Sequence, residues 1–132
     1  MPKKILLVDD DPGVHLVIVP ILSKAGYLVV SAKNGEQALH LALNERPNLV
    51  ILDVIMPGIK GRDLCKKIKA YEVLKDIAVI FLTAKDSQDD INAEMEAGAI
   101  AHLTKPVNPT DLLQAIDGII GPQTGHSQEL EK

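Results

Sequence analysis

The sequence predicts an open α/β fold in which helices cover both faces of a parallel five-stranded sheet. Two observations support this prediction: short runs rich in Ile, Leu and Val recur along the chain, and segments with helix start and stop signals separate them. Such an alternation calls for right-handed crossovers between parallel strands. The 132 residues suit one domain, and 46% hydrophobic with 24% charged residues is a globular balance.

Five apolar runs are the expected strands, because strands that are buried on both faces read as near-continuous hydrophobic sequence. Four of the runs are strong, and the fifth, which follows Gly98, is weaker. The expected strands are Ile5 to Val8, Tyr27 to Val30, Leu49 to Leu52, Ile77 to Leu82 and Ala99 to Leu103.

Helix signals lie between these runs. Asn34, Ser87 and Asn108 are residue types that cap helix N-termini, and Pro109 suits a first helical position. Pro20 should kink its helix or remove one backbone hydrogen bond. The expected helices run from about Pro12 to Ala25, from Asn34 through Leu43, from Ser87 to near Ala97 and from Asn108 through about Ile119, with a further helix around Cys65.

Composition also excludes several classes of function. One Phe, two Tyr, no Trp and a net charge of -4 offer neither stacking platforms nor attraction for nucleic acid. No apolar stretch has the roughly 20 residues that span a bilayer, and none resembles a signal-peptide core. With Cys65 alone, no internal disulfide can form. We therefore expect a cytoplasmic domain over residues 1–120, with residues 121–132 as a flexible C-terminal tail or the start of a linker.

Acidic side chains follow two of the expected strands. Asp9, Asp10 and Asp11 end the first strand, and Asp53 ends the third. Ligands of open α/β sheets bind at the carboxyl ends of the strands, so these acids converge if the two strands are neighbours. Converging carboxylates repel one another unless a cation compensates, and oxygen ligands suit Mg²⁺. The sequence therefore predicts a divalent metal site.

Thr83 ends the fourth strand and Lys105 follows the fifth, which adds a hydroxyl and an ammonium to the same edge. An anion would fit between the metal and Lys105, and this is a phosphoryl site built from ions. Asp53 could then act as the nucleophile that forms an acyl phosphate.

Four segments resemble the receiver domain of bacterial response regulators, and the match covers about residues 3 to 120. The resemblance implies a flavodoxin-like (βα)5 three-layer sandwich with strand order 2-1-3-4-5. It also implies a two-component phosphorelay, in which a sensor histidine kinase or phosphotransfer protein donates the phosphoryl group. The segments are Ile5 to Pro12, Leu49 to Gly58, Phe81 to Ala84 and Lys105-Pro106.

By this resemblance Asp53 is the phosphoacceptor. Mg²⁺, or Mn²⁺ in its place, would bind Asp10, Asp53 and the backbone carbonyl of Ile55, while Asp9 would act through a metal-bound water. The implied activity is limited to self-phosphorylation from a phosphodonor and slow autodephosphorylation. We therefore do not expect an enzyme that acts on external substrates.

The phosphoryl group has further expected contacts by the same resemblance. Thr83 is similar to the switch hydroxyl that moves toward the phosphoryl oxygen, and Ala84 to the small residue that leaves access to the site. Lys105 would pair with the phosphate. The Lys105-Pro106 bond is expected to be cis, because proline lowers the cost of that isomer.

Three positions depart from the family pattern or tune it. His102 stands where the family has a Tyr or Phe that swings inward, and its ionisation could make the switch sensitive to pH. Ile55 and Lys85 flank the path of the hydrolytic water. An apolar Ile55 should disfavour that water and prolong the life of the acyl phosphate.

The resemblance also implies an output surface formed by the fourth helix, fifth strand and fifth helix, roughly residues 87 to 119. A homodimer or a protein effector could use this surface, and the residues do not choose between them.

Three alternatives remain. A dehalogenase-type phosphatase would need a second acid two residues after Asp53, where Ile55 stands. A flavin-binding module would need a small-residue phosphate cradle in place of the aspartates after the first strand. A degenerate receiver would act only as an interaction module, but Asp10, Asp53, Thr83 and Lys105 are all present.

Overall fold

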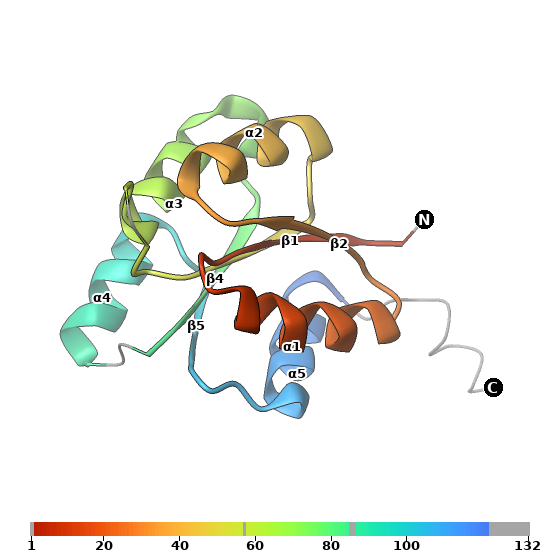
Figure 1. Cartoon of the computed structure of the whole chain (residues 1–132). Helices are drawn as coiled ribbons and strands as arrows, with labels where there is room; N and C mark the ends of the chain where they lie inside the picture. Colours follow the sequence, from red (N-terminus) through yellow and green to blue (C-terminus); the bar gives the residue numbers. More distant parts are fainter. Residues whose placement is uncertain (1, 57, 85–86, 122–132) are drawn as a thin grey trace.

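The structure is a computed structural model that describes residues 2–56, 58–84 and 87–121. Its five described strands are all parallel and lie in the order β2-β1-β3-β4-β5 (Figure 1). This confirms the predicted flavodoxin-like fold and its strand order. The strands are β1 (Lys4–Val8), β2 (Leu28–Ala32), β3 (Leu49–Leu52), β4 (Ala78–Thr83) and β5 (Ala101–Thr104).

Helices cover both faces of the sheet. Figure 1 shows α1 and α5 on one face and α2 and α3 on the other, with α4 beside β5. No helix in the described ranges is long and apolar enough to cross a membrane. The helices are α1 (Pro12–Lys24), α2 (Gly35–Glu45), α3 (Gly61–Ala70), the short 3₁₀ turn η1 (Glu72–Leu74), α4 (Gln88–Ala97) and α5 (Pro109–Ile120).

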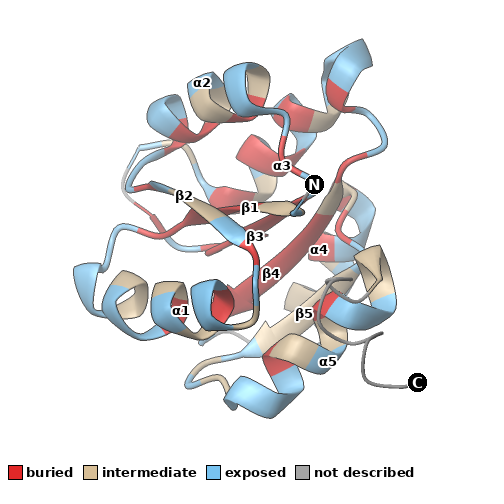
Figure 2. Ribbon diagram, turned by 90° about the vertical axis from the view of Figure 1, so that its right-hand side faces the viewer, coloured by how far each residue is buried: buried red, intermediate tan, exposed pale blue. Residues whose placement is uncertain are grey.

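Alternating side chains of each central strand pack into two separate cores, one on each face of the sheet. Ile5 and Leu7 pack toward α1 and α5, whereas Leu6 and Val8 pack toward α2 and α3. Because β1, β3 and β4 lie between two helical layers, they are buried along their length (Figure 2). This double burial explains why the strands read as continuous apolar runs.

The predicted caps are confirmed, and each fixes where a helix begins. Asn34, Ser87 and Asn108 accept hydrogen bonds from backbone N–H groups in the first turns of α2, α4 and α5. Asp11 caps α1 in the same way. Gly98 has φ 115° at the end of α4, a left-handed conformation that favours glycine.

The predicted strands β2 and β5 begin one or two residues too early. The backbone N–H of Tyr27 donates to the carbonyl of Leu22 at 3.1 Å, and that of Ala99 donates to Glu94 at 3.1 Å. These groups close the preceding helices and are not available to the sheet. Helix closure therefore sets the strand starts, which hydrophobicity alone could not reveal.

Candidate functional site

Two buried aspartates lie side by side at the carboxyl edge of the sheet. Asp9 directly follows β1 and Asp53 directly follows β3, and these neighbouring strands pair Val8 with Leu52 at their ends. The residues are 1% and 7% exposed. The N–H of Asp53 donates to the carbonyl of Val8 at 3.1 Å, so the ladder of β1 and β3 continues into the site.

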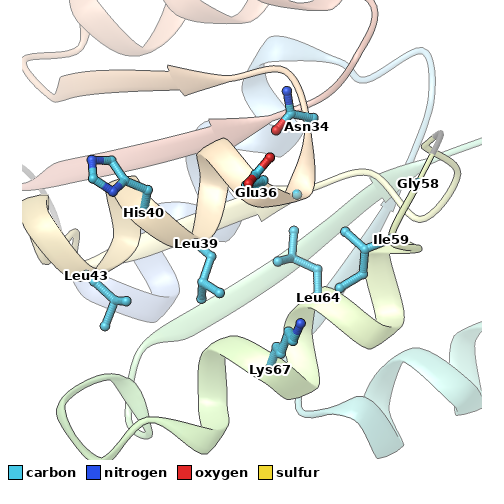
Figure 3. Close-up of a pocket in the computed structure, with 10 residues that line it drawn as sticks. Asn34, Glu36, Leu39, His40, Leu43, Gly58, Ile59, Leu64 and Lys67 are labelled. Atoms are coloured by element: carbon cyan, nitrogen blue, oxygen red, sulfur yellow. The ribbon is translucent and has the colours of Figure 1, made fainter.

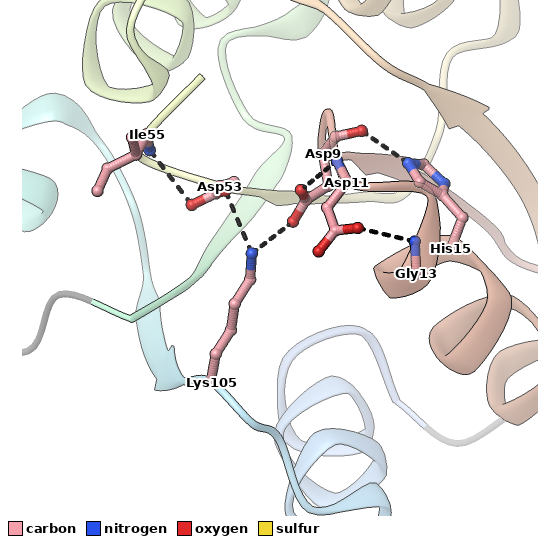
Figure 4. Close-up of polar contacts among 7 residues, drawn as sticks. All are labelled: Asp9, Asp11, Gly13, His15, Asp53, Ile55 and Lys105. Atoms are coloured by element: carbon pink, nitrogen blue, oxygen red, sulfur yellow. Dashed lines mark hydrogen bonds and ion pairs between the residues drawn. The ribbon is translucent and has the colours of Figure 1, made fainter. Parts of the chain in front are cut away.

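Lys105, which follows β5, binds both aspartates through its ammonium group. Its Nζ lies 2.8 Å from Asp9 Oδ2 and 3.2 Å from Asp53 Oδ2 (Figure 4). Its backbone N–H donates to the carbonyl of Thr83 at 2.9 Å, which fixes the chain after β5. The expected cis peptide bond between Lys105 and Pro106 is present.

Asp9, Asp10 and Asp53 form the donor set that a metal ion would use. One carboxylate oxygen from each lies within 4.8 Å of the others, and Asp10 is exposed while its two neighbours are buried. Only one ammonium, that of Lys105, is hydrogen-bonded to these acids in the described ranges. The cluster therefore carries excess negative charge, and its oxygen donors fit a hard divalent cation.

Burial has the largest effect on the pKa of Asp53. It raises the pKa of Asp53 above the usual 3.8, and the negative charge of Asp9 raises it further, whereas a hydrogen bond from Ile55 and the charge of Lys105 lower it in part. Burial lowers the pKa of Lys105, but the bonds and charges of the two acids outweigh it and leave a net increase. Lys105 is thus held as an ammonium, whereas Asp53 gains from a further cation.

The loop after Asp53 is anchored by backbone groups. The N–H of Ile55 donates to Asp53 Oδ1 at 3.2 Å, and the N–H of Gly61 donates to the carbonyl of Val54 at 2.9 Å. A Cβ at position 61 would lie 2.1 Å from the carbonyl oxygen of Asp53. Only glycine allows this approach, so Gly61 fixes the loop that carries the acceptor.

His15 belongs to the neighbourhood of the site, which the sequence motifs did not indicate. Its Nε2 lies 2.8 Å from the carbonyl oxygen of Asp9, and its Nδ1 is buried with no hydrogen-bond partner among the described residues. Asp9 Oδ1 also accepts a hydrogen bond from the N–H of Asp11 at 3.0 Å. The spacing from the cap Asp11 to His15, one helical turn, is the sequence signal that could have revealed this contact.

The remaining predicted site residues lie around this centre. Thr83 is fully buried at the end of β4, whereas Ala84 and the side chain of Ile55 are exposed. His102 does not join the acids, because its ring binds Glu94 on α4. Lys85 lies outside the described residues, so its expected role remains a prediction.

A hollow lies between α2 and α3, away from Asp9, Asp10 and Asp53. Leu39, Leu43, Ile59 and Leu64 contribute apolar side chains to it, and Lys67 lies at its edge (Figure 3). Its lining includes none of the acids that converge after β1 and β3. The acidic cluster at the carboxyl edge of the sheet is therefore separate from this hollow.

Comparison with known proteins gives a family match for the chain. The response regulator receiver domain matches residues 5–117. The chain is 37% identical over 116 residues to sporulation initiation phosphotransferase F of Bacillus subtilis (strain 168), covering 88% of this chain and 92% of that protein. It is 35% identical over 120 residues to the alkaline phosphatase synthesis transcriptional regulatory protein PhoP of the same organism, covering 91% of this chain and 49% of that protein. The chain thus spans about half the length of such regulators.

Solved structures show the same architecture. The receiver domain of sensor histidine kinase PA1611 from Pseudomonas aeruginosa PAO1 superposes with a TM-score of 0.85 at 30% identity, covering 92% of this chain and 99% of that one. That structure has a magnesium ion coordinated in its active site cleft. From the sequence match, the sheet order and this likeness, the chain belongs to the response regulator receiver domain family of two-component systems.

Proposed function

We propose that this chain is a phosphoacceptor response regulator in which Asp53 takes a phosphoryl group from a sensor histidine kinase or phosphotransfer protein. The observation that carries the proposal is the meeting of a buried Asp53 with two further carboxylates and one shared ammonium. That arrangement holds three carboxylates against one ammonium, so a divalent cation would balance its charge and leave room for an anion beside Lys105. A phosphoryl group with its metal supplies this combination.

Asp10, Asp53 and the backbone carbonyl of Ile55 would hold Mg²⁺ or Mn²⁺, with Asp9 acting through a water. The donor set fits, because three carboxylates with Asp10 open to solvent are ligands of the kind that Mg²⁺ prefers. A bound divalent ion would neutralise charge that develops on the transferring phosphoryl oxygens. The magnesium ion in the receiver domain of PA1611 supports the same assignment.

Other residues of the site would orient Asp53 and bind the transferred phosphoryl group. The N–H of Ile55 binds one oxygen of Asp53 and the ammonium of Lys105 binds the other, and this would fix the orientation of the carboxylate for attack. A carboxylate oxygen would attack phosphorus while the bond from phosphorus to the donor imidazole nitrogen breaks, and that nitrogen keeps the electron pair. Lys105 would then pair with the phosphoryl oxygens, and the hydroxyl of Thr83 would donate to one of them.

An apolar surface beside the site suits the phosphodonor. Leu16 and Val17 on α1 are 77% and 58% exposed. Val17 also lines a hollow that contains Val107 and extends to Lys105. A helix of the donor protein that packs on this surface would bring its phosphohistidine to the open side of Asp53. The partner is thus a cytoplasmic protein, and neither nucleic acid nor membrane is needed for transfer.

Phosphorylation would alter the surface formed by α4, β5 and α5, which would then bind a protein effector or a second copy of the chain. No turnover of external phosphoesters is expected. The acid that a dehalogenase-type phosphatase requires two residues after its nucleophile is replaced here by Ile55, whose side chain is 54% exposed.

Intact-mass measurement after incubation with Mg²⁺ and acetyl phosphate tests the proposal. The wild type should gain the mass of one phosphoryl group, and Asp53→Ala should gain none. Asp63→Asn, which removes an exposed acid from the first turn of α3, is the matched control and should behave as the wild type. A wild type without added mass, or an Asp53→Ala variant with it, would overturn the assignment.

A further inference from the structure

Glu94 is an acidic residue buried between α4 and β5. It lies in the middle of α4 and is 0% exposed, although carboxylates are rarely buried completely. Its Oε1 lies 2.5 Å from His102 Nδ1 on β5, and the side chain of His102 is 8% exposed. Its Oε2 has no hydrogen-bond partner among the described residues. One bond therefore supports the whole buried carboxylate.

This contact differs from the packing of the other helices on the same face. α2 and α3 bury Ala38, Ala42, Leu64 and Ile68 against the sheet. α4 buries Ala97 in that core and adds Glu94. An apolar side chain would avoid the desolvation of a carboxylate, which makes a buried pair costly unless its geometry is well satisfied. Packing alone does not explain Glu94.

The partner of Glu94 lies on a row of side chains that leads to the acceptor site. In the register of β4 and β5, Phe81 pairs with His102 and Thr83 pairs with Thr104. Because side chains alternate along a strand, all four point to the same face of the sheet. Phe81 belongs to the core on the α2 to α4 side, so that face is the one covered by α4.

The ring of His102 makes a short contact through Nδ1 and a longer one through Nε2. Nδ1 lies against Oε1 of Glu94, so this nitrogen connects the ring to α4. Nε2 faces Thr104 Oγ1 at 3.5 Å, the limit of hydrogen-bond distance. The ring therefore cannot turn toward the end of β4 without breaking its bond to Glu94 or moving α4.

We infer that Glu94 is a positioning residue that couples α4 to the phosphorylation site through His102. The inference rests on the proposed function and adds its transmission step. When the phosphoryl group binds the hydroxyl of Thr83, the space beside His102 changes. The short contact between His102 and Glu94 passes that change to α4. Without Glu94 the site would still be phosphorylated, but α4 would not respond.

Nuclear magnetic resonance of the full chain, recorded with and without Mg²⁺ and beryllium fluoride as a phosphoryl mimic, tests the coupling. In the wild type the mimic should shift backbone amides near Asp53 and also those of α4, together with the Nδ1 proton of His102. Glu94→Gln keeps an oxygen acceptor without the charge, so it should shift the Nδ1 resonance and reduce the response of α4.

Two further variants keep the test decisive. Glu94→Met with His102→Leu replaces the pair by apolar side chains and should lose the response of α4 even if Glu94→Gln folds poorly. Glu96→Gln removes a neighbouring exposed acid of α4 and should keep the full response.

Parallel intact-mass measurement with acetyl phosphate separates the two claims. Added mass in every variant, with the response of α4 lost only when the pair is changed, is the expected result. Added mass with a wild-type response of α4 in both pair variants would overturn the coupling alone. No added mass in the wild type would overturn the proposed function and the coupling with it.

Discussion

Lys105 and His102, three positions apart, each bind a buried acid, but the two clusters balance their charge differently. Lys105 serves Asp9 and Asp53 together, while Asp10 adds a third carboxylate that is open to solvent. His102 serves Glu94 alone, in a closed contact. The exposed Asp10 leaves the first cluster open to a ligand, whereas the second cluster is enclosed. Comparing their responses to mutation and to Mg²⁺ would test this distinction.

The largest effect is expected in the closed pair. His102→Leu leaves the carboxylate of Glu94 buried without its partner and should lower the free energy of unfolding by about 3 kcal/mol. Urea unfolding monitored by circular dichroism would measure it, and Mg²⁺ should not change the difference. His40→Leu, at an exposed histidine of α2, is the control and should stay near the wild type. If Mg²⁺ restored the stability of His102→Leu, the pair would not be closed to ligands.

Lys105→Met should cost less. It removes the ammonium shared by Asp9 and Asp53, but the side chain of Lys105 is 23% exposed, so water offsets part of the loss. We expect about 1 to 2 kcal/mol without metal, and a smaller difference in Mg²⁺, since the cation takes over part of the role of the ammonium. The same unfolding assay applies, with the exposed Lys66→Met as control. An equal loss in both conditions would show that no metal compensates the acids.

Asp53→Asn should stabilise the metal-free protein, by a gain on the order of 1 kcal/mol at pH 7. Since the folded-state pKa of Asp53 is raised, its ionised form is less favourable in the folded chain than in the unfolded chain. Stability is therefore lost as pH rises through the folded pKa. The gain should vanish below the ordinary aspartate pKa of 3.8, where both states are protonated. Thermal unfolding of the wild type and Asp53→Asn across this pH range, without Mg²⁺, would measure the gain. If burial does not dominate the pKa of Asp53, the variant should instead be less stable than the wild type.

The smallest effect is expected at Ile55. Ile55→Asn should speed loss of the phosphoryl group a few-fold, which corresponds to less than about 1.4 kcal/mol in activation free energy. An amide there can hold the hydrolytic water that an apolar side chain disfavours. The decay of phosphorylated protein, followed by intact mass after removal of the phosphodonor, measures it. Equal decay rates would remove Ile55 from the control of lifetime.

The fold and the open cluster could be predicted from sequence because their signals are local. Doubly buried strands produce continuous apolar runs, and the acids stand out where Val8 and Leu52 end. The topology then brings together residues that neighbouring strands carry to one edge. Strand starts could not be predicted as well, since the N–H groups of Tyr27 and Ala99 close the preceding helices.

The closed pair was harder to find, because Glu94 and Glu96 look alike in an acidic helix. One signal does separate them. Ile91, Glu94 and Ala97 recur at a spacing of three, so Glu94 lies on the stripe that turns inward and Glu96 does not. That pattern indicates burial but not the partner. Only the register of β5 against β4 shows that His102 is in reach.

Gly61 also bears on protein engineering. Because its bare backbone lies against the carbonyl of Asp53, the acceptor loop is fixed at its far end by main-chain atoms. The exposed side chains of Ile55 and Lys60 contribute nothing to that anchor. These two side chains could therefore be substituted to change signal lifetime or partner choice. A redesign of this loop must leave position 61 untouched.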